Sequence, residues 1–267
     1  MIERKNSRQL TGNIYRGRVT NILHNIQSAF IDIHEGENGF IHISDILENA
    51  QKFQELFDMD FDLNIEQGNR QKKQRETDIA KIFKPDQPVL VQVVKEPIGN
   101  KGARLTSNIS IAGRYLVLLP NTPHRGVSRK IEDRDGRDRL KKLIQAFEMP
   151  QDMGLICRTA CLNATPEQLI QEAHDLIENW KEIVDKFEKA TRPTCLFEES
   201  DLIKRSLITA IDKQYDRILI DDHGTFQRCK QLHSRYSSDN NLKIDYYRDK
   251  IPMFENPVEV SAGWCLR

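Results

Sequence analysis

The chain has 267 residues, and its 40 lysine and arginine residues are balanced by 40 aspartate and glutamate residues. A hydrophobic fraction of 38%, a charged fraction of 30% and a mean hydropathy of -0.60 exclude both a disordered chain and a membrane-embedded one. Because the net charge is zero, overall charge does not point to nucleic acid, and any site for a polyanion must be local.

The amino-terminal residues predict no targeting segment. The stretch MIERKNSRQLTG lacks the apolar segment of a signal peptide, and no apolar run approaches the roughly 20 residues that a membrane-spanning helix needs. The five cysteines include no C-x-x-C pair, so we expect free thiols rather than disulfides or a zinc site. Together these features predict a cytoplasmic protein.

Short β-strands separated by turns dominate the next part of the chain. Residues 13–22 and 89–96 have strand patterns, residues 28–43 read as a hairpin around a polar turn, and residues 103–111 form a strand after the glycine-containing turn PIGNKG. A charged insertion occupies residues 47–88. Short strands with one long insertion predict a small closed β-barrel of the oligonucleotide-binding kind.

Two phenylalanines fall on the polar face of the predicted hairpin. Alternation assigns one alanine and four isoleucines to the core face, namely Ala29, Ile31, Ile33, Ile41 and Ile43. Phe30 and Phe40 then lie on the opposite face, together with Asp32 and His42. Exposed rings on a barrel sheet commonly stack on the bases of single-stranded nucleic acid. The alternative is that the insertion covers both rings as a second small core.

Basic side chains accompany the two phenylalanines. Arg16 and Arg18 share a face of the preceding strand, and Lys95 and Lys101 flank the glycine-containing turn. Aromatic rings edged with cations that attract phosphates are typical of an RNA-binding surface. The sequence therefore predicts that this part of the chain binds single-stranded RNA.

The middle of the chain offers a second candidate site. A buried strand, RYLVLLP, is followed by a basic loop containing HRGVSRK, an amphipathic helix and the strand GLICRTA. Arg158 and Thr159 lie where that last strand ends, and they supply a guanidinium fork and a hydroxyl for phosphate oxygens. The alternative is that Arg158 and Thr159 are solvated surface residues that bind no ligand. A long helix over residues 166–189 follows, with Thr165 as its N-cap.

Beyond residue 193 the pattern predicts an α/β layer of alternating strands and helices. Asp221 and Asp222 end one of these strands, where a nuclease could hold magnesium, although acidic residues also commonly begin helices. The chain contains no nucleophile elbow and no phosphate-binding P-loop. We therefore expect no catalytic residue from the pattern itself.

Several segments, in this order, resemble the bacterial ribonuclease E/G family, and they are closer to its ribonuclease G branch. They are GNIYRGRV, SAFIDI, GFIHISDI, VQVVKEPIGNKGARLT, RYLVLLPN, GVSRKIE, GLICRTA and IPMFE. The resemblance extends over residues 12–255. It implies an S1-type barrel at 12–106, a sensor region for an RNA 5′-monophosphate at 107–192, and part of a structural RNase H-like layer at 193–255. The implied fold class is thus α+β and multidomain.

The resemblance also implies individual roles. Phe30 and Phe40 match the family's base-stacking pair, and Lys101 matches a lysine that contacts RNA. Val127, Arg158 and Thr159 match the pocket for the 5′-end. The implied partner is single-stranded RNA, preferably with a 5′-monophosphate, and the implied role is in the processing and turnover of ribosomal and messenger RNA.

The chain also departs from the family pattern. Residues 1–11 resemble a remnant of a longer beginning, and the tail 256–267 does not match. The family's magnesium-binding aspartates and its cysteine zinc-link belong to a downstream domain, so we expect Mg and Zn only in the full-length family enzyme, no cofactor in this chain, and no dimer through that link. The expected role is RNA binding without cleavage. The alternatives are an endoribonuclease that uses Asp221 and Asp222, or a gene fragment that folds poorly.

Overall fold

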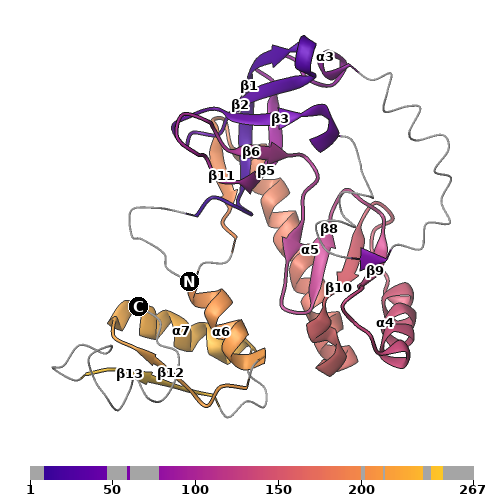
Figure 1. Ribbon diagram of the computed structural model, residues 1–267, viewed down its shortest axis with the longest axis vertical. Coiled ribbons are helices and arrows are strands. Elements are labelled where there is room, and N and C mark those ends of the chain that lie inside the picture. Colours follow the sequence, from indigo (N-terminus) through magenta and orange to yellow (C-terminus); the bar gives the residue numbers. More distant parts are fainter. Residues whose placement is uncertain are drawn as a thin grey trace. The chain divides into compact units, whose positions relative to one another are not determined.

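The computed structural model describes residues 9–46, 59–60, 78–199, 202–212, 214–236 and 242–248 (Figure 1). The chain divides into two compact units, Leu10–Glu199 and a smaller one that combines Met1–Gln9 with Ser200–Arg267. Each unit has a hydrophobic core of its own. Within these described ranges, no helix has both the length and the apolar character needed to cross a membrane.

A closed five-stranded barrel forms the first part of the larger unit. Its strands are β1 (Ile14–Leu23), β2 (Ser28–Asp32), β3 (Gly39–His42), β5 (Pro88–Lys95) and β6 (Arg104–Thr106). They follow the order β1-β2-β3-β6-β5, and pairing of β1 with β5 closes the barrel. Only β3 and β6 run parallel among these neighbours. The predicted barrel of the oligonucleotide-binding kind is confirmed.

Alternation sorts the hairpin side chains as predicted. The five residues assigned to the core are at most 9% exposed, and they pack inside the barrel with residues such as Val19, Val91 and Leu105. Phe30 and Phe40 are half-buried on the outer face. The parity of a strand thus fixes which side chains are available to a ligand on the outside of the barrel.

A sixth strand joins the barrel sheet from much later in the chain. Strand β11 (Thr194–Phe197) pairs antiparallel with the first residues of β1. Asn13 reinforces this junction because its Oδ1 accepts a hydrogen bond of 2.8 Å from the backbone N–H of Glu199. The larger unit consequently extends to residue 199, whereas the sequence predicts a boundary between residues 192 and 193.

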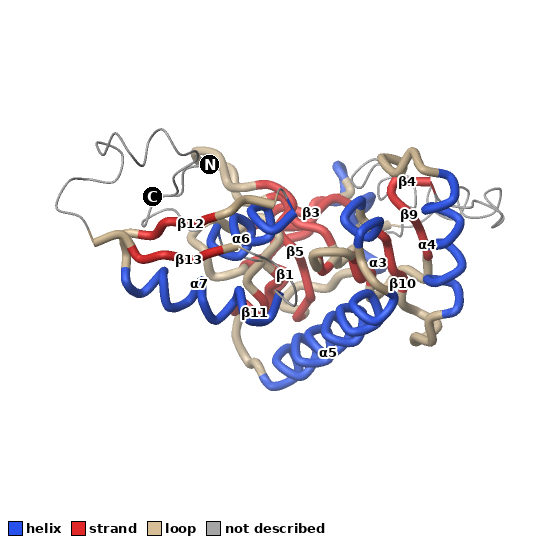
Figure 2. The backbone as a smooth tube through the Cα atoms, turned by 90° about the horizontal axis from the view of Figure 1, so that it is seen from below, coloured by secondary structure: helices blue, strands red, loops and turns tan. Residues whose placement is uncertain are grey.

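The rest of the larger unit is a five-stranded sheet covered by two helices. Its strands are β4 (Met59–Asp60), β7 (Ile111–Ala112), β8 (Leu116–Leu119), β9 (Arg125–Ser128) and β10 (Gly154–Cys157), in the order β4-β9-β10-β8-β7. Helices α4 (Arg134–Ala146) and α5 (Pro166–Lys189) pack on one face of this sheet (Figure 2). Leu140 of α4 and Trp180 of α5 belong to the same core.

Helix α5 begins where the sequence predicts. The Thr165 hydroxyl accepts the N–H of Gln168, and the Gln168 side chain accepts the N–H of Thr165, which completes a capping box ahead of Pro166. Its buried apolar residues, among them Leu169, Leu176 and Trp180, lie in the core. The helix also contacts β11, so the same core includes Ile14 and Leu196 from the edge of the barrel sheet.

Part of the insertion at 47–88 is described. Strand β4 pairs with β9 of the second sheet, and a short helix α3 (Ile79–Ile82) precedes β5. Asp78 caps α3 by accepting the N–H of Ala80, and this hydrogen bond is the main reason why the pKa of Asp78 is lowered. Apart from β4, residues 47–77 lie outside the described residues. The alternative in which the insertion covers the two phenylalanines concerns these residues.

The smaller unit is an α/β layer, as predicted. Helix α6 (Leu202–Asp212) and helix α7 (His223–Tyr236) flank two parallel strands, β12 (Arg217–Ile220) and β13 (Lys243–Tyr246). Its core includes Leu207, Ile211, Ile218, Ile220 and Cys229. The cysteines of the described ranges, namely Cys157, Cys161, Cys195 and Cys229, are free thiols. The predicted tail 256–267 lies outside the described residues.

Two sequence predictions about strands were wrong. The segment HRGVSRK was expected to be a loop, but residues 125–128 form β9, which pairs with β10 on one side and β4 on the other. Residues 103–111 were expected to form one strand, but they supply β6 to the barrel and the start of β7 to the second sheet. Between these two strands, the buried Gln92 side chain hydrogen-bonds the backbone of Ser110. Its Nε2 donates to the Ser110 carbonyl, and its Oε1 accepts the Ser110 N–H.

Candidate nucleic-acid interface

The strand register aligns the two phenylalanines with two cations. Phe30 on β2 pairs with Phe40 on β3, Phe40 pairs with Arg104 on β6, and Arg104 pairs with Lys95 on β5. The two rings meet edge to face, with centroids 6.0 Å apart and an interplanar angle of 66°. We call these four residues the aromatic-cationic row.

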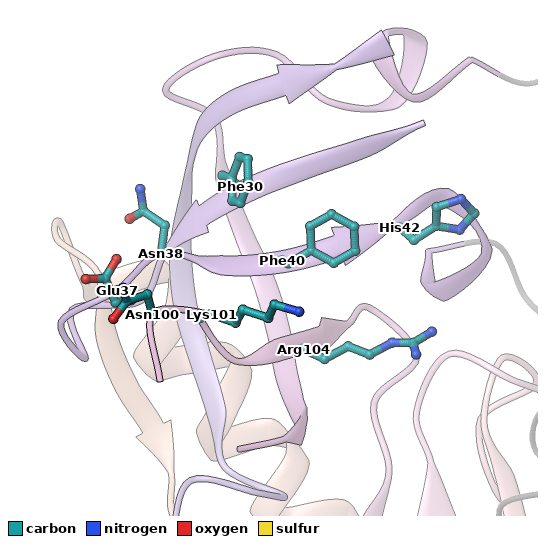
Figure 3. Close-up of a pocket in the computed structure, with 9 residues that line it drawn as sticks. Phe30, Glu37, Asn38, Phe40, His42, Asn100, Lys101 and Arg104 are labelled. Carbon is teal, nitrogen blue, oxygen red and sulfur yellow. The ribbon is translucent and has the colours of Figure 1, made fainter. Parts of the chain in front are cut away.

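A pocket of about 830 Å³ lies over the first three residues of this row. In Figure 3, Phe30 and Phe40 occupy the middle of the pocket, with Lys101 and Arg104 extending along one side. Glu37, Asn38 and Asn100 gather at one end, and His42 lies at the other. The lining residues of the described part of the chain are Phe30, Glu37, Asn38, Phe40, His42, Asn100, Lys101, Gly102 and Arg104.

A tight turn between β5 and β6 brings Lys101 to the pocket. Ile98 and Lys101 exchange two backbone hydrogen bonds of 3.0 and 3.1 Å across the turn, and Gly99 takes a positive φ of 57°. At Gly102 the chain passes so close to Asn38 that a Cβ atom would collide with the carbonyl of Asn38. Gly102 thus permits the close approach that shapes this side of the pocket.

The charges of the pocket are arranged unevenly. Lys101 is exposed, and Arg104 is anchored by Asp45, whose carboxylate oxygen lies 3.1 Å from the arginine Nη2. Asp45 ends the short helical turn η2 (Ile43–Asp45) and is buried. Glu37 is the acidic side chain among the lining residues that the structure describes. Cations therefore concentrate on the side of the pocket formed by β6 and the preceding turn.

His42 is held in a defined orientation. Its Nδ1 accepts the backbone N–H of Ser44 at 3.1 Å and lies 2.8 Å from the Ser44 hydroxyl. Nε2 is then the ring nitrogen that faces away from this turn. The ring therefore adds a polar edge to the end of the pocket shown in Figure 3.

The structure does not bring every predicted RNA-binding residue to the pocket. Arg18 shares the outer face, but its guanidinium lies 3.6 Å from the carboxylate of Asp32. Arg16 lies two residues earlier on β1, and its guanidinium packs over the ring of Phe187 on α5 at 5.5 Å from the centroid. Lys95 belongs to the aromatic-cationic row by register and is exposed, but it does not line the pocket.

The second candidate site lies at adjacent strand ends in the second sheet. Strands β9 and β10 run parallel, so their carboxyl ends meet at one edge of the sheet. Arg158 and Thr159 directly follow β10, both exposed, and Arg158 is the N-cap of the helical turn η3 (Thr159–Asn163). Val127 pairs with Cys157 in β10, and its side chain is 1% exposed in the core, so only its backbone could contact a ligand.

Among the described residues, the guanidinium of Arg158 makes one hydrogen bond. Its Nη1 donates a hydrogen bond of 2.6 Å to the carbonyl of Gly113, in the turn between β7 and β8. Its backbone N–H donates to the carbonyl of Tyr115 in the same turn at 2.8 Å. A guanidinium carries five N–H donors, so the remaining ones are available for an anion.

The acidic pair after β12 takes part in the start of a helix. Asp222 Oδ2 accepts the N–H of Thr225 at 2.7 Å in the first turn of α7, and Asp221 is exposed beside it. Across the ranges that the structure describes, no three histidine, cysteine, aspartate or glutamate side chains are grouped so as to hold a metal ion.

Some lining residues were not predicted from the sequence. Arg104 lies between the buried residues Ala103 and Leu105, so the alternation of this strand could have identified it. Asn38 and Asn100 come from two different turns, and only the fold brings them together. No signal in the sequence connects these two turns.

Comparison with known proteins gives consistent similarities. The model of the ribonuclease E/G family matches residues 110–260. The ribonuclease G proteins of Salmonella typhimurium (strain SL1344) and Escherichia coli (strain K12) are each 33% identical over 254 residues, which cover 95% of this chain and 49% of the relative. Ribonuclease E of Haemophilus influenzae is 32% identical over 256 residues, covering 96% of this chain and 26% of the relative. The chain thus spans about half the length of these ribonuclease G proteins.

Proposed function

The chain belongs to the ribonuclease E/G family, and on that basis we propose that it is an RNA-binding and 5′-end-sensing portion of an endoribonuclease of this type. Its ligand is single-stranded RNA, and its role lies in the processing and turnover of ribosomal and messenger RNA. The observation that carries the proposal is the aromatic-cationic row with its pocket on the outer face of the barrel.

In this proposal the two rings stack on unpaired bases. Phe30 and Phe40 are half-buried, so each is held by the barrel while part of its surface remains open. Every base has a face that can stack, and each stack contributes about 1–3 kcal/mol, whereas a duplex hides these faces. The rings therefore favour single strands without selecting one sequence.

The cations beside the rings attract the phosphates. Lys101 and Arg104 line the pocket, and Lys95 extends the row away from it. Arg18 adds charge on the same face, but its pair with Asp32 limits that contribution. We assign no RNA contact to Arg16, because Phe187 of α5 covers its guanidinium.

The 5′-monophosphate binds at the second site in this proposal. Arg158 offers the donors that Gly113 leaves unused, and the Thr159 hydroxyl lies next to it in the chain. The backbone of Val127 on the neighbouring strand forms the other wall. A 5′-monophosphate end presents a charged phosphate to the arginine fork, whereas a 5′-hydroxyl end has no terminal phosphate. The fork therefore distinguishes the two ends.

The test is a titration of the chain with single-stranded RNA of about 10 nucleotides, a length within the range that one barrel of this kind binds. We expect tighter binding of the 5′-monophosphate form than of the 5′-hydroxyl form, and loss of that preference in Arg158→Gln. Equal affinity of the wild-type chain for both forms would remove the sensing function. Absence of binding to either form would remove the RNA-binding function as well.

We propose no hydrolytic step for this chain. Incubation with RNA and magnesium should leave the RNA intact, and the Asp221→Asn, Asp222→Asn double variant should behave like the wild type. Magnesium-dependent cleavage that this double change abolishes would instead support an active site at the end of β12.

A further inference from the structure

Glu172 on α5 is placed beneath the turn that connects β7 and β8. Its Oε1 accepts the backbone N–H of Arg114 at 2.6 Å, and its Oε2 accepts the N–H groups of Tyr115 and Leu116, each at 2.7 Å. Three consecutive backbone donors thus converge on one carboxylate. A glutamine could not replace it without cost, because its amide nitrogen is a donor and would face a second donor.

Arg158 contacts the same turn. Its Nη1 donates to the carbonyl of Gly113, and its backbone N–H donates to the carbonyl of Tyr115. The turn itself is closed by a hydrogen bond of 2.8 Å from the N–H of Gly113 to the carbonyl of Leu116. The turn 113–116 therefore connects the carboxylate of Glu172 with the guanidinium of Arg158.

Gly113 marks how closely the carboxylate and the turn are fitted. A Cβ atom at Gly113 would lie 2.6 Å from the carboxyl carbon of Glu172 and 2.8 Å from both of its oxygens. These separations are shorter than a non-bonded contact allows, so a side chain at Gly113 must displace either the turn or the Glu172 carboxylate, and the close contact between the two is lost in both cases. The carbonyl that receives the Arg158 hydrogen bond belongs to this same residue.

The two charges also act on each other. Burial raises the pKa of Glu172, and the backbone N–H donors of the turn, followed by the positive charge of Arg158, lower it in part. A carboxylate in this position is costly to bury unless its oxygens are satisfied. The three N–H donors satisfy them, so the carboxylate can persist close to the arginine without a direct ion pair that would occupy the guanidinium.

We propose that Glu172 is a positioning residue for the 5′-phosphate site: it fixes the turn 113–116, and the turn holds the guanidinium of Arg158 in the orientation that receives a terminal phosphate. This inference rests on the proposed 5′-end sensing. Glu172 touches no RNA in it and acts through the backbone of the turn.

The test compares the affinities of the full chain for 5′-monophosphate and 5′-hydroxyl RNA of one sequence. The variants are Glu172→Gln, Gly113→Ala and Arg158→Gln, with Glu178→Gln on an exposed part of α5 as the matched control. We expect the ratio of the two affinities to fall about tenfold in Glu172→Gln and Gly113→Ala, with 5′-hydroxyl binding unchanged, because an oriented charged hydrogen bond is lost. Glu178→Gln should keep the wild-type ratio.

The ratio separates positioning from simple destabilisation. Both RNAs are titrated into the same preparation, so a smaller folded fraction weakens both affinities equally and leaves their ratio unchanged. If Arg158→Gln abolishes the preference but Glu172→Gln and Gly113→Ala retain it, the positioning role is overturned and the 5′-end sensing stands. If the wild-type chain has no preference, the 5′-end sensing itself fails.

Discussion

Arg104 and Asp45 form a charged pair at the edge of the pocket on the outer face of the barrel. The arginine Nε and Nη2 lie 3.3 and 3.1 Å from Oδ2 of Asp45, and Nη2 also lies 3.4 Å from Oδ1. The Asp45 side chain is 8% exposed, whereas that of Arg104 is 44% exposed. The buried carboxylate therefore orients an arginine that remains accessible to phosphate.

This pair predicts unequal effects on RNA affinity. Arg104→Gln removes a phosphate-binding charge, and we expect the Kd for single-stranded RNA to rise about tenfold. Asp45→Asn keeps the arginine charged but loosens its orientation, so the Kd should rise by a smaller factor. Fluorescence anisotropy with a labelled 5′-hydroxyl RNA measures both. A larger loss in Asp45→Asn than in Arg104→Gln would contradict this assignment.

The stacking pair predicts a loss of RNA affinity when either ring is removed. Replacement of Phe30 or Phe40 by alanine should raise the RNA Kd about 5- to 150-fold, which corresponds to a stack of about 1–3 kcal/mol. Tyr215→Ala is the matched control, because Tyr215 is an exposed aromatic residue in the smaller unit. Unchanged affinity in both phenylalanine variants, with melting curves like those of the wild type, would argue that the rings serve only the barrel.

Lys101 predicts a change in the salt dependence of binding. Each phosphate contact to a single strand contributes about 0.7 to the slope of log affinity against log salt concentration. Lys101→Gln should reduce that slope by about this amount, whereas Lys181→Gln on the exposed side of α5 should leave it as in the wild type. Titrations at several salt concentrations decide the matter, and equal slopes for wild type and Lys101→Gln would exclude a phosphate contact.

Gly102 predicts that the shape of the pocket matters separately from its charge. Gly102→Ala introduces a Cβ that collides with the Asn38 carbonyl, so RNA affinity should fall and the free energy of unfolding should decrease by about 1–3 kcal/mol. At Gly36 the φ is also positive, at 87°, but the space around it is open. Gly36→Ala should therefore cost about 1 kcal/mol in stability while RNA affinity is retained.

Glu172 predicts a particular pH dependence of stability. Burial raises the pKa of Glu172 above its usual 4.5, although its N–H donors and Arg158 lower it in part. The folded state thus keeps this proton to a higher pH than the unfolded state does. The free energy of unfolding, compared with that of Glu172→Gln, should fall as pH rises from about 4.5 until the raised pKa is passed, and then level off. Denaturant titrations across this range measure it, and a rising difference would contradict the sign.

Local patterns in the sequence were sufficient for the outer face of the barrel. The hairpin alternates strictly between residues 29 and 33, so the inward and outward assignments of Ile31 and Phe30 followed from parity. The capping box at Thr165 was likewise a local signal, and α5 begins there. In both cases the decisive interactions join residues that are near in sequence.

Long-range pairings could not be predicted in the same way. Arg16 and Arg18 have the same parity, but α5 covers only the end of β1 that carries Arg16. Strand β9 contains a glycine and has only four residues, and it is a strand because β4 and β10 supply partners from distant segments. Glu172 and Arg158 likewise contact the same β7–β8 turn, and local sequence gives no signal of these contacts.

The pairing of β11 with β1 affects the order in which the barrel can mature during synthesis. A ribosome releases the barrel strands β1 to β6 well before β11 and α5. Until then, the backbone edge at Ile14–Arg16 has no β11 to pair with, and the Ile14 side chain is not covered by α5. An uncovered strand edge can act as a template for intermolecular pairing. A nascent or truncated barrel that stops at residue 106 should therefore be prone to aggregate, and synthesis through residue 199 should relieve this tendency.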